Sequence, residues 1–310
     1  MSRLKGRDFL TLMDFSKEEL EYFLDTAAEL KRKQRMGEPH EYLKGKQVAL
    51  IFEKHSTRTR VSFQAGIAQL GAQGFYMKSD ELQLARGEPI KDTARVIDRY
   101  CDALVIRTFG QETVEEFAQY MENPVINALT DLTHPCQGLA DLLTIREKKG
   151  AFKGLKLAFV GDMFNMSHTT MIWGSMMGVD TYIAGPVEKY QPNSRITKFA
   201  KEKAEATGSK LVLTTNLEEA VTDADIIFAI TFFSMGQKDV EQKKKDFGPY
   251  QITEEVLAKA KDDVIFMHPL PAHRGEELTE EVIEGPRSVV WDQAENRLHV
   301  QKAVLSSIIT

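Results

Sequence analysis

The sequence predicts an α/β protein built from two doubly wound parallel-sheet domains. Short apolar runs rich in β-branched residues alternate with longer segments of helical period along nearly the whole chain. Regular alternation of strand and helix is typical of a parallel sheet. The alternation forms two series separated near the middle of the chain, and 310 residues are enough for two domains of ordinary size.

The first series predicts four strands, at 47–52, 74–77, 103–107 and 124–127. The helices expected in this series lie at 58–70, 90–100 and 113–120. The second series predicts five strands, at 155–160, 181–184, 210–213, 226–229 and 264–267. We expect helices of similar length between the strands of the second series. Each series therefore predicts one parallel-sheet unit.

A helical stretch at 136–149 separates the two series and marks the domain junction. Its leucines can form one buried stripe, and the stretch ends in Lys-Lys-Gly at 148–150. We therefore predict domains at 1–140 and 141–310. A last helix at 294–309 follows the second series, and we expect it to pack back on the first domain.

Composition indicates a globular protein of the cytoplasm. The net charge is −6 and the mean hydropathy is −0.32, which favours neither a nucleic acid nor a membrane as partner. No apolar run approaches the ~20 residues of a spanning helix, and residues 1–10 lack the apolar region of a secretory signal. Cys101 and Cys136 are too few for a disulfide framework or a thiolate metal site. The charge run at 241–246 predicts a solvated loop or helix face.

Residues 56–60 form the first segment that suggests chemistry. They read Ser56-Thr57-Arg58-Thr59-Arg60, after a predicted strand and at the start of a predicted helix. Backbone N–H groups at a helix start, hydroxyl groups and a planar guanidinium all suit a phosphate group. The alternative is that Ser56 or Thr57 only caps the helix and the arginines are solvated.

Further polar side chains follow other predicted strands. Arg107 closes a very apolar strand, and ligands of open parallel sheets bind beyond the carboxyl ends of the strands. His134 follows the fourth strand; a lone histidine is more often structural, but this position favours the same crevice. The segment at 268–275 ends a strand and contains two prolines, and 294–297 reads Ala-Glu-Asn-Arg. Taken singly, these last two segments predict a turn and a surface helix.

Several common motifs are missing. Gly161 is the single glycine where a dinucleotide-binding fingerprint needs three, which removes the main support for an NAD-dependent oxidoreductase. Gly45-Lys46 is followed by Gln47, so it is not a P-loop. The zinc-protease motif H-E-x-x-H and the hydrolase motif G-x-S-x-G are also missing.

The sequence resembles the aspartate/ornithine carbamoyltransferase family. The resemblance rests on S-T-R-T-R, R-T-F, H-P-C-Q, H-P-L-P and A-E-N-R, which occur in this order across 56 to 297. It implies that the N-terminal domain binds carbamoyl phosphate, that the C-terminal domain binds an amine acceptor, and that the active-site cleft lies between them. It also implies small-molecule substrates as the partners, with no cofactor and no metal. Because attack by an amine creates an oxyanion and then expels phosphate, positioned donors can suffice for the chemistry.

The resemblance assigns roles to residues of this chain by position. The residues implied to bind carbamoyl phosphate are Ser56, Thr57, Arg58, Thr59, Gln83, Arg107, His134, Gln137, Leu270 and Arg297. Of these, Arg58, Arg107 and His134 would be catalytic. Arg107 and His134 would contact the carbamoyl oxygen, while Gln137 and the carbonyl of Leu270 would hold the NH₂ group. The loop that carries Gln83 would complete the site of a neighbouring subunit, which implies a homotrimer or a multiple of trimers.

The acceptor side departs from the family pattern. The resemblance places the acceptor-binding residues at Asn165, Ile230, Ser234, Met235 and Pro269. Asn165 and the S-M-G-Q at 234–237 resemble ornithine enzymes. However, Ile230 replaces an aspartate that would pair with the α-ammonium of ornithine, and Pro269 replaces a cysteine. The H-P-L-P form is the one that aspartate enzymes carry, yet the basic residues that aspartate enzymes have after Gly161-Asp162 are missing here.

We therefore expect a carbamoyltransferase whose acceptor the sequence does not identify. The alternatives are an ornithine carbamoyltransferase with altered acceptor contacts and a degenerate, non-catalytic family member. Met163, Phe164, Phe232 and Phe233 suggest an apolar acceptor pocket, although apolar residues at strand ends are just as often packing residues.

Overall fold

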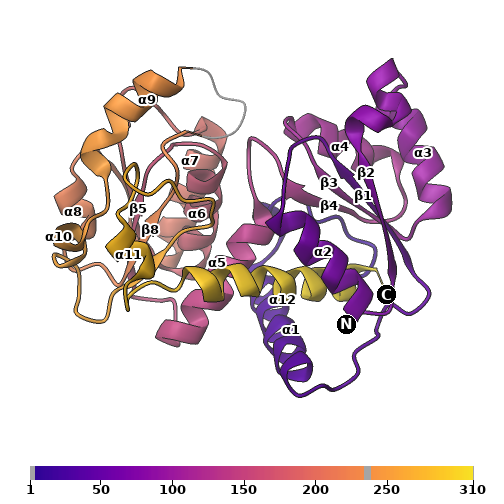
Figure 1. Ribbon diagram of the computed structural model, residues 1–310, viewed down its shortest axis with the longest axis horizontal. Coiled ribbons are helices and arrows are strands. Elements are labelled where there is room, and N and C mark those ends of the chain that lie inside the picture. The colour runs from indigo at the N-terminus through magenta and orange to yellow at the C-terminus, as the bar shows by residue number, and fades with distance from the viewer. Residues whose placement is uncertain (1–3, 234–238, 310) are drawn as a thin grey trace. The chain divides into compact units, whose positions relative to one another are not determined.

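The computed structural model of the protein describes residues 4–233 and 239–309 (Figure 1). The chain divides into two compact units. Unit 1 consists of Met1–Leu143 together with Glu295–Thr310, and unit 2 consists of Thr144–Ala294. Two long helices, α5 (Pro135–Lys149) and α12 (Val290–Ile308), each contribute residues to both units.

Unit 1 contains a four-stranded parallel sheet in the order β2-β1-β3-β4. The strands are β1 (Gln47–Phe52), β2 (Gln73–Lys78), β3 (Ala103–Arg107) and β4 (Val125–Leu129). From β1 the chain moves to one edge of the sheet, and from β3 it moves to the other. The boundary between β1 and β3 is thus a topological switch point, where open sheets form a crevice beyond the strand ends.

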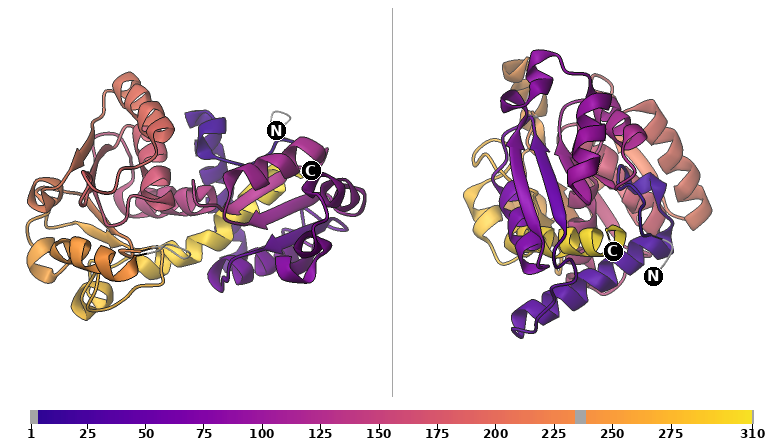
Figure 2. Two further views of the ribbon diagram at one scale, coloured as in Figure 1. Left: turned by 90° about the horizontal axis from the view of Figure 1, so that it is seen from above. Right: turned by 90° about the vertical axis from the view of Figure 1, so that its right-hand side faces the viewer.

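Helices surround this sheet in unit 1. They are α1 (Lys17–Arg35), α2 (Arg58–Gln69), α3 (Ile90–Tyr100) and α4 (Gln111–Tyr120), with short 3₁₀ turns η1 (Leu12–Asp14), η2 (Ser79–Glu81) and η3 (Gln83–Arg86). The later part of α12 packs against α1 and α2 (Figure 2). Gly66 of α2 allows this close packing, because a Cβ atom there would lie 3.1 Å from Cγ of Lys302.

Unit 2 contains a five-stranded parallel sheet in the order β7-β6-β5-β8-β9. The strands are β5 (Lys156–Val160), β6 (Asp180–Ala184), β7 (Leu211–Thr214), β8 (Ile226–Ala229) and β9 (Ile265–Met267). Its switch point lies between β5 and β8. The helices and turns are α6 (Asn165–Met177), α7 (Ser194–Thr207), α8 (Leu217–Val221), α9 (Val240–Phe247), η4 (Gly248–Tyr250), α10 (Glu254–Leu257) and α11 (Glu280–Glu284).

The structure confirms the predicted fold class, with two parallel-sheet α/β units. One expectation about helices was wrong, and one helix was missed. The helices of unit 2 are not of similar length, since α8 has 5 residues and α7 has 14. The helix α1 was not predicted at all, although Ser16 and Glu19 form a capping box at its start. None of the helices in the described ranges is both long and apolar enough to cross a membrane.

Candidate active site

The first group of candidate residues follows β1 at the switch point of unit 1. Helix α2 begins at Arg58, and Thr57 is its N-cap residue. The alternative for this segment was that Ser56 or Thr57 only caps the helix. The Thr57 side chain makes no capping hydrogen bond, which removes the Thr57 part of that alternative. Thr59 is buried, whereas Ser56 and Arg58 are partly buried. The start of α2 therefore offers N–H groups and hydroxyl groups at the crevice.

Two buried arginines converge on Thr59. Arg107, the last residue of β3, is 6% exposed, and Arg297 of α12 is 3% exposed. Arg297 Nη2 donates to Thr59 Oγ1 at 3.1 Å, and Arg107 Nη1 lies 3.5 Å from the same oxygen. Arg297 Nη1 also donates to Gln137 Oε1 at 2.7 Å. Residues that are far apart in the sequence thus form one hydrogen-bonded group in unit 1.

The arginines of this cluster influence one another electrostatically, and the pKa of each is lowered. Burial, followed by the charges of Arg297 and Arg58, lowers the pKa of Arg107 to about 10. Burial also lowers the pKa of Arg297 to about 10, against the opposing effect of Asp141, and burial lowers the pKa of Arg58. Among the described residues, the Nε atoms of Arg107 and Arg297 have no hydrogen-bond partner. Because buried charges require a counter-charge, this cluster is suited to bind an anionic ligand.

His134 lies directly before α5 in the same unit. Its backbone oxygen accepts a hydrogen bond from Gln137 N at 3.0 Å, which fixes the start of the helix. Burial, together with the charges of Arg297, Arg107, Arg58 and Lys54, holds the pKa of His134 well below its ordinary value. The imidazole is therefore neutral at neutral pH, and can donate one hydrogen bond without adding charge.

Lys54 was not among the candidates from the sequence, although it belongs to the same charged group. Its ammonium pairs with Asp131 and lies 4.3 Å from the centre of the Phe109 ring. Burial lowers the pKa of Lys54 despite the partner carboxylate. The neighbouring Glu53 accepts a hydrogen bond from the Thr108 hydroxyl. The sequence feature that could have identified Lys54 is the charged pair Glu53-Lys54, which directly follows an apolar strand.

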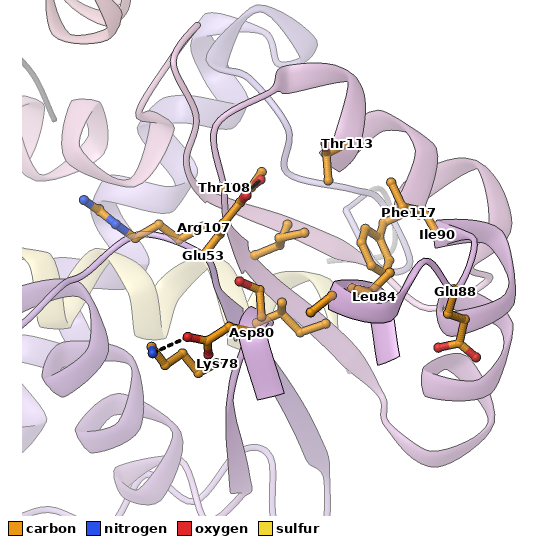
Figure 3. Close-up of a pocket in the computed structure, with 14 residues that line it drawn as sticks. Glu53, Lys78, Asp80, Leu84, Glu88, Ile90, Arg107, Thr108, Thr113 and Phe117 are labelled. Atoms are coloured by element: carbon orange, nitrogen blue, oxygen red, sulfur yellow. Dashed lines mark hydrogen bonds and ion pairs between the residues drawn. The ribbon is translucent and has the colours of Figure 1, made fainter. Parts of the chain in front are cut away.

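A cavity of about 550 Å³ adjoins Arg107 in unit 1 (Figure 3). Its lining includes the apolar Leu84, Ile90 and Phe117, and the guanidinium of Arg107 points away from them (Figure 3). The cavity therefore shares Arg107 with the arginine cluster, but its apolar end is a separate space. Gln83, in the turn beside this cavity, is exposed and has no hydrogen bond to the arginines within the described chain.

In unit 2, candidate residues lie at the switch point between β5 and β8. Asn165 is buried at the start of α6. Ile230 follows β8 and packs against Gly161, where a Cβ atom would lie 2.6 Å from Ile230 Cγ2. Asp162, next to Gly161, forms a buried ion pair with Lys243 at 2.6 Å. The charge run at 241–246 is therefore not wholly solvated, because Lys243 anchors α9 to the end of β5.

The apolar residues proposed for an acceptor pocket include residues of the core. Phe232 is buried and stacks on Phe247 with ring centres 5.6 Å apart. Met163 is also buried, so these two side chains act in packing. Phe233 instead stacks on His273 at 5.4 Å. The predicted acceptor residues Ser234 and Met235 lie outside the described residues.

The H-P-L-P segment of unit 2 has a defined backbone conformation. Leu270 has φ 59°, in the left-handed region that a leucine rarely adopts, and Pro269 is partly buried. Leu270 N donates to His268 Nδ1 at 2.9 Å, so the ring hydrogen of His268 lies on Nε2, 3.3 Å from Glu277 Oε1. Glu277 Oε1 also accepts from His273 N at 2.6 Å. His268, which lies against Glu277, therefore anchors the backbone N–H of Leu270.

The described residues include one group with a spacing that suits a metal ion. It consists of His273, Glu276 and Glu277, whose ligating atoms lie within 4.8 Å of one another. Glu276 already pairs with Lys244 at 2.7 Å, and Glu277 is engaged by His268 and His273. Lys244 supplies a counter-charge to Glu276, and N–H donors engage Glu277, so structural contacts account for the group.

Known families and proteins are similar to this chain over nearly its whole length. Family models described as "Aspartate/ornithine carbamoyltransferase, carbamoyl-P binding domain" and "Aspartate/ornithine carbamoyltransferase, Asp/Orn binding domain" match residues 7–147 and 153–308. The ornithine carbamoyltransferase of Anoxybacillus flavithermus is 51% identical over 308 residues, covering 99% of this chain and 98% of that protein. That of Geobacter sulfurreducens is 52% identical over 305 residues, covering 98% of this chain and 99% of that protein.

Solved structures of ornithine carbamoyltransferases are similar to this chain as well. The ornithine carbamoyltransferase from Pyrococcus furiosus has a TM-score of 0.96 and 48% identity, covering 100% of this chain and 99% of that one. The anabolic ornithine carbamoyltransferase from Campylobacter jejuni has a TM-score of 0.90 and 42% identity, covering 96% of this chain and 97% of that one.

Proposed function

The chain belongs to the aspartate/ornithine carbamoyltransferase family, and we propose that its acceptor is ornithine. The protein is thus a carbamoyltransferase, and the full-length identity of about 50% to ornithine carbamoyltransferases carries the choice of acceptor. This choice reverses the preference expected from sequence, which placed an unidentified acceptor first. The retained arginine cluster argues against the alternative of a degenerate, non-catalytic member.

The arginine cluster of unit 1 supports a role in binding carbamoyl phosphate. In this proposal the start of α2, with Ser56, Thr57, Arg58 and Thr59, holds the phosphate. The free N–H groups of the helix start and the guanidinium of Arg58 match a phosphate dianion in charge and geometry. Arg297, which already contacts Thr59, would complete the group.

Arg107 and His134 are proposed to contact the carbamoyl oxygen. The amine nitrogen attacks the carbamoyl carbon, a C–N bond forms, and an electron pair moves to the oxygen. That oxyanion is stabilised by fixed donors that need no rearrangement during the reaction. Collapse of the intermediate breaks the bond to the phosphate oxygen, and the proton lost by the amine leaves with phosphate. A neutral His134 suits this role because its ring N–H can donate a hydrogen bond to the oxyanion without adding charge to the arginine cluster.

A different small amine is the second candidate acceptor, and Ile230 is the observation that favours it. Ile230 is buried beside Gly161 and offers an incoming ammonium group no charge. The carboxylate of Asp162 in the same region is paired with Lys243. An acceptor without a free α-ammonium group would suit these residues.

Initial rates of phosphate release with carbamoyl phosphate distinguish the two candidates. The acceptors compared are ornithine, aspartate, an ornithine blocked at its α-amino group, and a simple diamine. The proposal expects ornithine to have the highest kcat/KM of these acceptors. The double variant Ile230→Asp, Pro269→Cys should raise the kcat/KM for ornithine by less than about tenfold. A diamine or blocked ornithine that outperforms ornithine by tenfold, together with a gain of tenfold or more in the double variant, would establish the second candidate.

We also propose a homotrimer, or a multiple of trimers, located in the cytoplasm. The exposed position of Gln83 supports the first part, because an exposed loop is available to a neighbouring subunit. The two free cysteines, Cys101 and Cys136, are consistent with a reducing compartment. Light scattering after size-exclusion chromatography measures the mass of the assembly, and a monomer that retains full activity would contradict the role of Gln83.

A further inference from the structure

Asp141 is a buried carboxylate that none of the sequence-based candidates included. It lies on α5, one helical turn after Gln137, and its side chain has no exposure to solvent. Gln137 Nε2 donates to Asp141 Oδ1 at 2.8 Å. Gln137 Oε1 accepts from Arg297 Nη1 at 2.7 Å. The Gln137 amide is therefore held between a negative and a positive side chain.

These two partners permit one orientation of the Gln137 amide. A carboxylate can only accept hydrogen bonds and a guanidinium can only donate them. Rotating the amide by half a turn would place its oxygen against Asp141 and its NH₂ group against Arg297. Both contacts would then be repulsive in a buried site, where unmade hydrogen bonds are most costly.

The fixed orientation has a consequence for ligand recognition. An amide oxygen has two lone pairs, and Arg297 uses one of them in this structure. The second lone pair can accept a hydrogen bond from an N–H group of a ligand. It gains nothing from a methyl group, which has no hydrogen to donate. An orientation set by Asp141 thus favours a ligand that carries NH₂ over one of the same shape that carries CH₃.

We propose that Asp141 is a positioning residue that makes the site selective for carbamoyl phosphate over acetyl phosphate, acting through the amide of Gln137. The inference rests on the proposed function, in which Gln137 contacts the NH₂ group of carbamoyl phosphate. The two ligands share the phosphate and the carbonyl group and differ only in NH₂ against CH₃. Acetyl phosphate is therefore the probe that isolates the contribution of the amide.

The test compares dissociation constants of carbamoyl phosphate, acetyl phosphate and inorganic phosphate for the wild-type protein and Asp141→Asn. The asparagine can face Gln137 with either its oxygen or its NH₂ group, so the amide loses its unique orientation. The expected result is a fall in the preference for carbamoyl over acetyl phosphate of about fivefold, the effect of one hydrogen bond. The affinity for inorganic phosphate should change less than about twofold, because the phosphate contacts are not altered.

Two further variants keep the result interpretable. Gln137→Met removes the amide, and the effect of Asp141→Asn on the preference should vanish in that background, because Asp141 acts through Gln137. Asp225→Asn is the matched control, since Asp225 is a buried carboxylate of unit 2 that accepts hydrogen bonds from Lys156 N and Lys261 Nζ, both at 2.8 Å. Asp225→Asn should have the same preference for carbamoyl phosphate over acetyl phosphate as the wild-type protein. Thermal melting of each variant shows whether it is folded.

An equal loss of affinity for all three ligands in Asp141→Asn would overturn the inference, because it would mean that Asp141 only supports the fold. An unchanged preference in a folded Asp141→Asn variant would also overturn it, while leaving the proposed function intact. If the wild-type protein did not bind carbamoyl phosphate, the proposed function would fail first, and the inference would fail with it.

Discussion

Replacing Arg107 by methionine should stabilise the free protein and abolish its response to carbamoyl phosphate. Arg107 is buried beside two other arginines, and its one hydrogen-bond contact among the described residues is Thr59 Oγ1 at 3.5 Å. A pKa lowered from the ordinary arginine value to about 10 corresponds to a cost of about 3 kcal/mol for holding the charge in the folded state. Methionine removes that charge and keeps much of the side-chain volume.

The sign of this effect follows from proton linkage. The folded state binds the Arg107 proton more weakly than the unfolded state does, so at neutral pH the charged side chain lowers the free energy of unfolding. Arg107→Met should therefore raise the free energy of unfolding, by up to about 3 kcal/mol. Function, rather than stability, then explains the presence of the arginine.

Urea unfolding with and without carbamoyl phosphate measures both effects. The wild-type protein should gain about 2.7 kcal/mol at a ligand concentration about 100-fold above the dissociation constant, and Arg107→Met should gain nothing. Arg99→Met, the same change at an exposed residue of α3, should alter neither quantity by more than about 0.5 kcal/mol. A variant at position 107 that is less stable without ligand, yet still stabilised by carbamoyl phosphate, would refute the reasoning.

Three further predictions concern single side chains. Arg58→Ala should lose phosphate binding, whereas His134→Ala should keep most binding and lose about 10²–10³ in kcat; equal losses of binding in a titration would contradict these separate roles. Burial raises the pKa of Glu277, but hydrogen bonds from His268 and His273 N outweigh it and lower this pKa below 4.5. Glu277→Gln should therefore lower the free energy of unfolding by about 1–3 kcal/mol above pH 5, and the difference from the wild-type protein should become smaller at lower pH. Burial lowers the pKa of Lys302 to about 8 from 10.5, so stability relative to Lys302→Met should rise between pH 8 and 10.5; a flat difference in urea titrations would contradict this.

Strand ends were the part of the fold that sequence predicted best. Strand β3 ends at Arg107, as expected, because four apolar residues precede a charge that must lie near the sheet edge. The same reasoning placed the start of α2 at Arg58. Both residues then fall at the switch point between β1 and β3, and the sheet order brings their strands side by side.

Contacts between distant segments were harder to predict. Asp141 reads as a polar residue between the apolar Ala140 and Leu142 of α5, and only the packing of α12 shows that Arg297 shares its partner Gln137. Lys243 reads as part of a solvated charge run, yet it pairs with Asp162 across 81 positions of sequence. The pairings of Arg297 with Gln137 and of Lys243 with Asp162 have no local sequence pattern, because tertiary packing brings these partners together.

The most direct test of the proposed function follows the carbamoyl group itself. Carbon-labelled carbamoyl phosphate and ornithine are incubated with the wild-type protein and with Arg107→Met, and the products are separated and identified by mass spectrometry. We expect the wild-type protein to transfer the label to the side-chain nitrogen of ornithine with one phosphate released per product, and the variant to transfer almost none. Two results would contradict the account. One is that no label reaches ornithine although another amine supports phosphate release, and the other is that both proteins transfer the label equally.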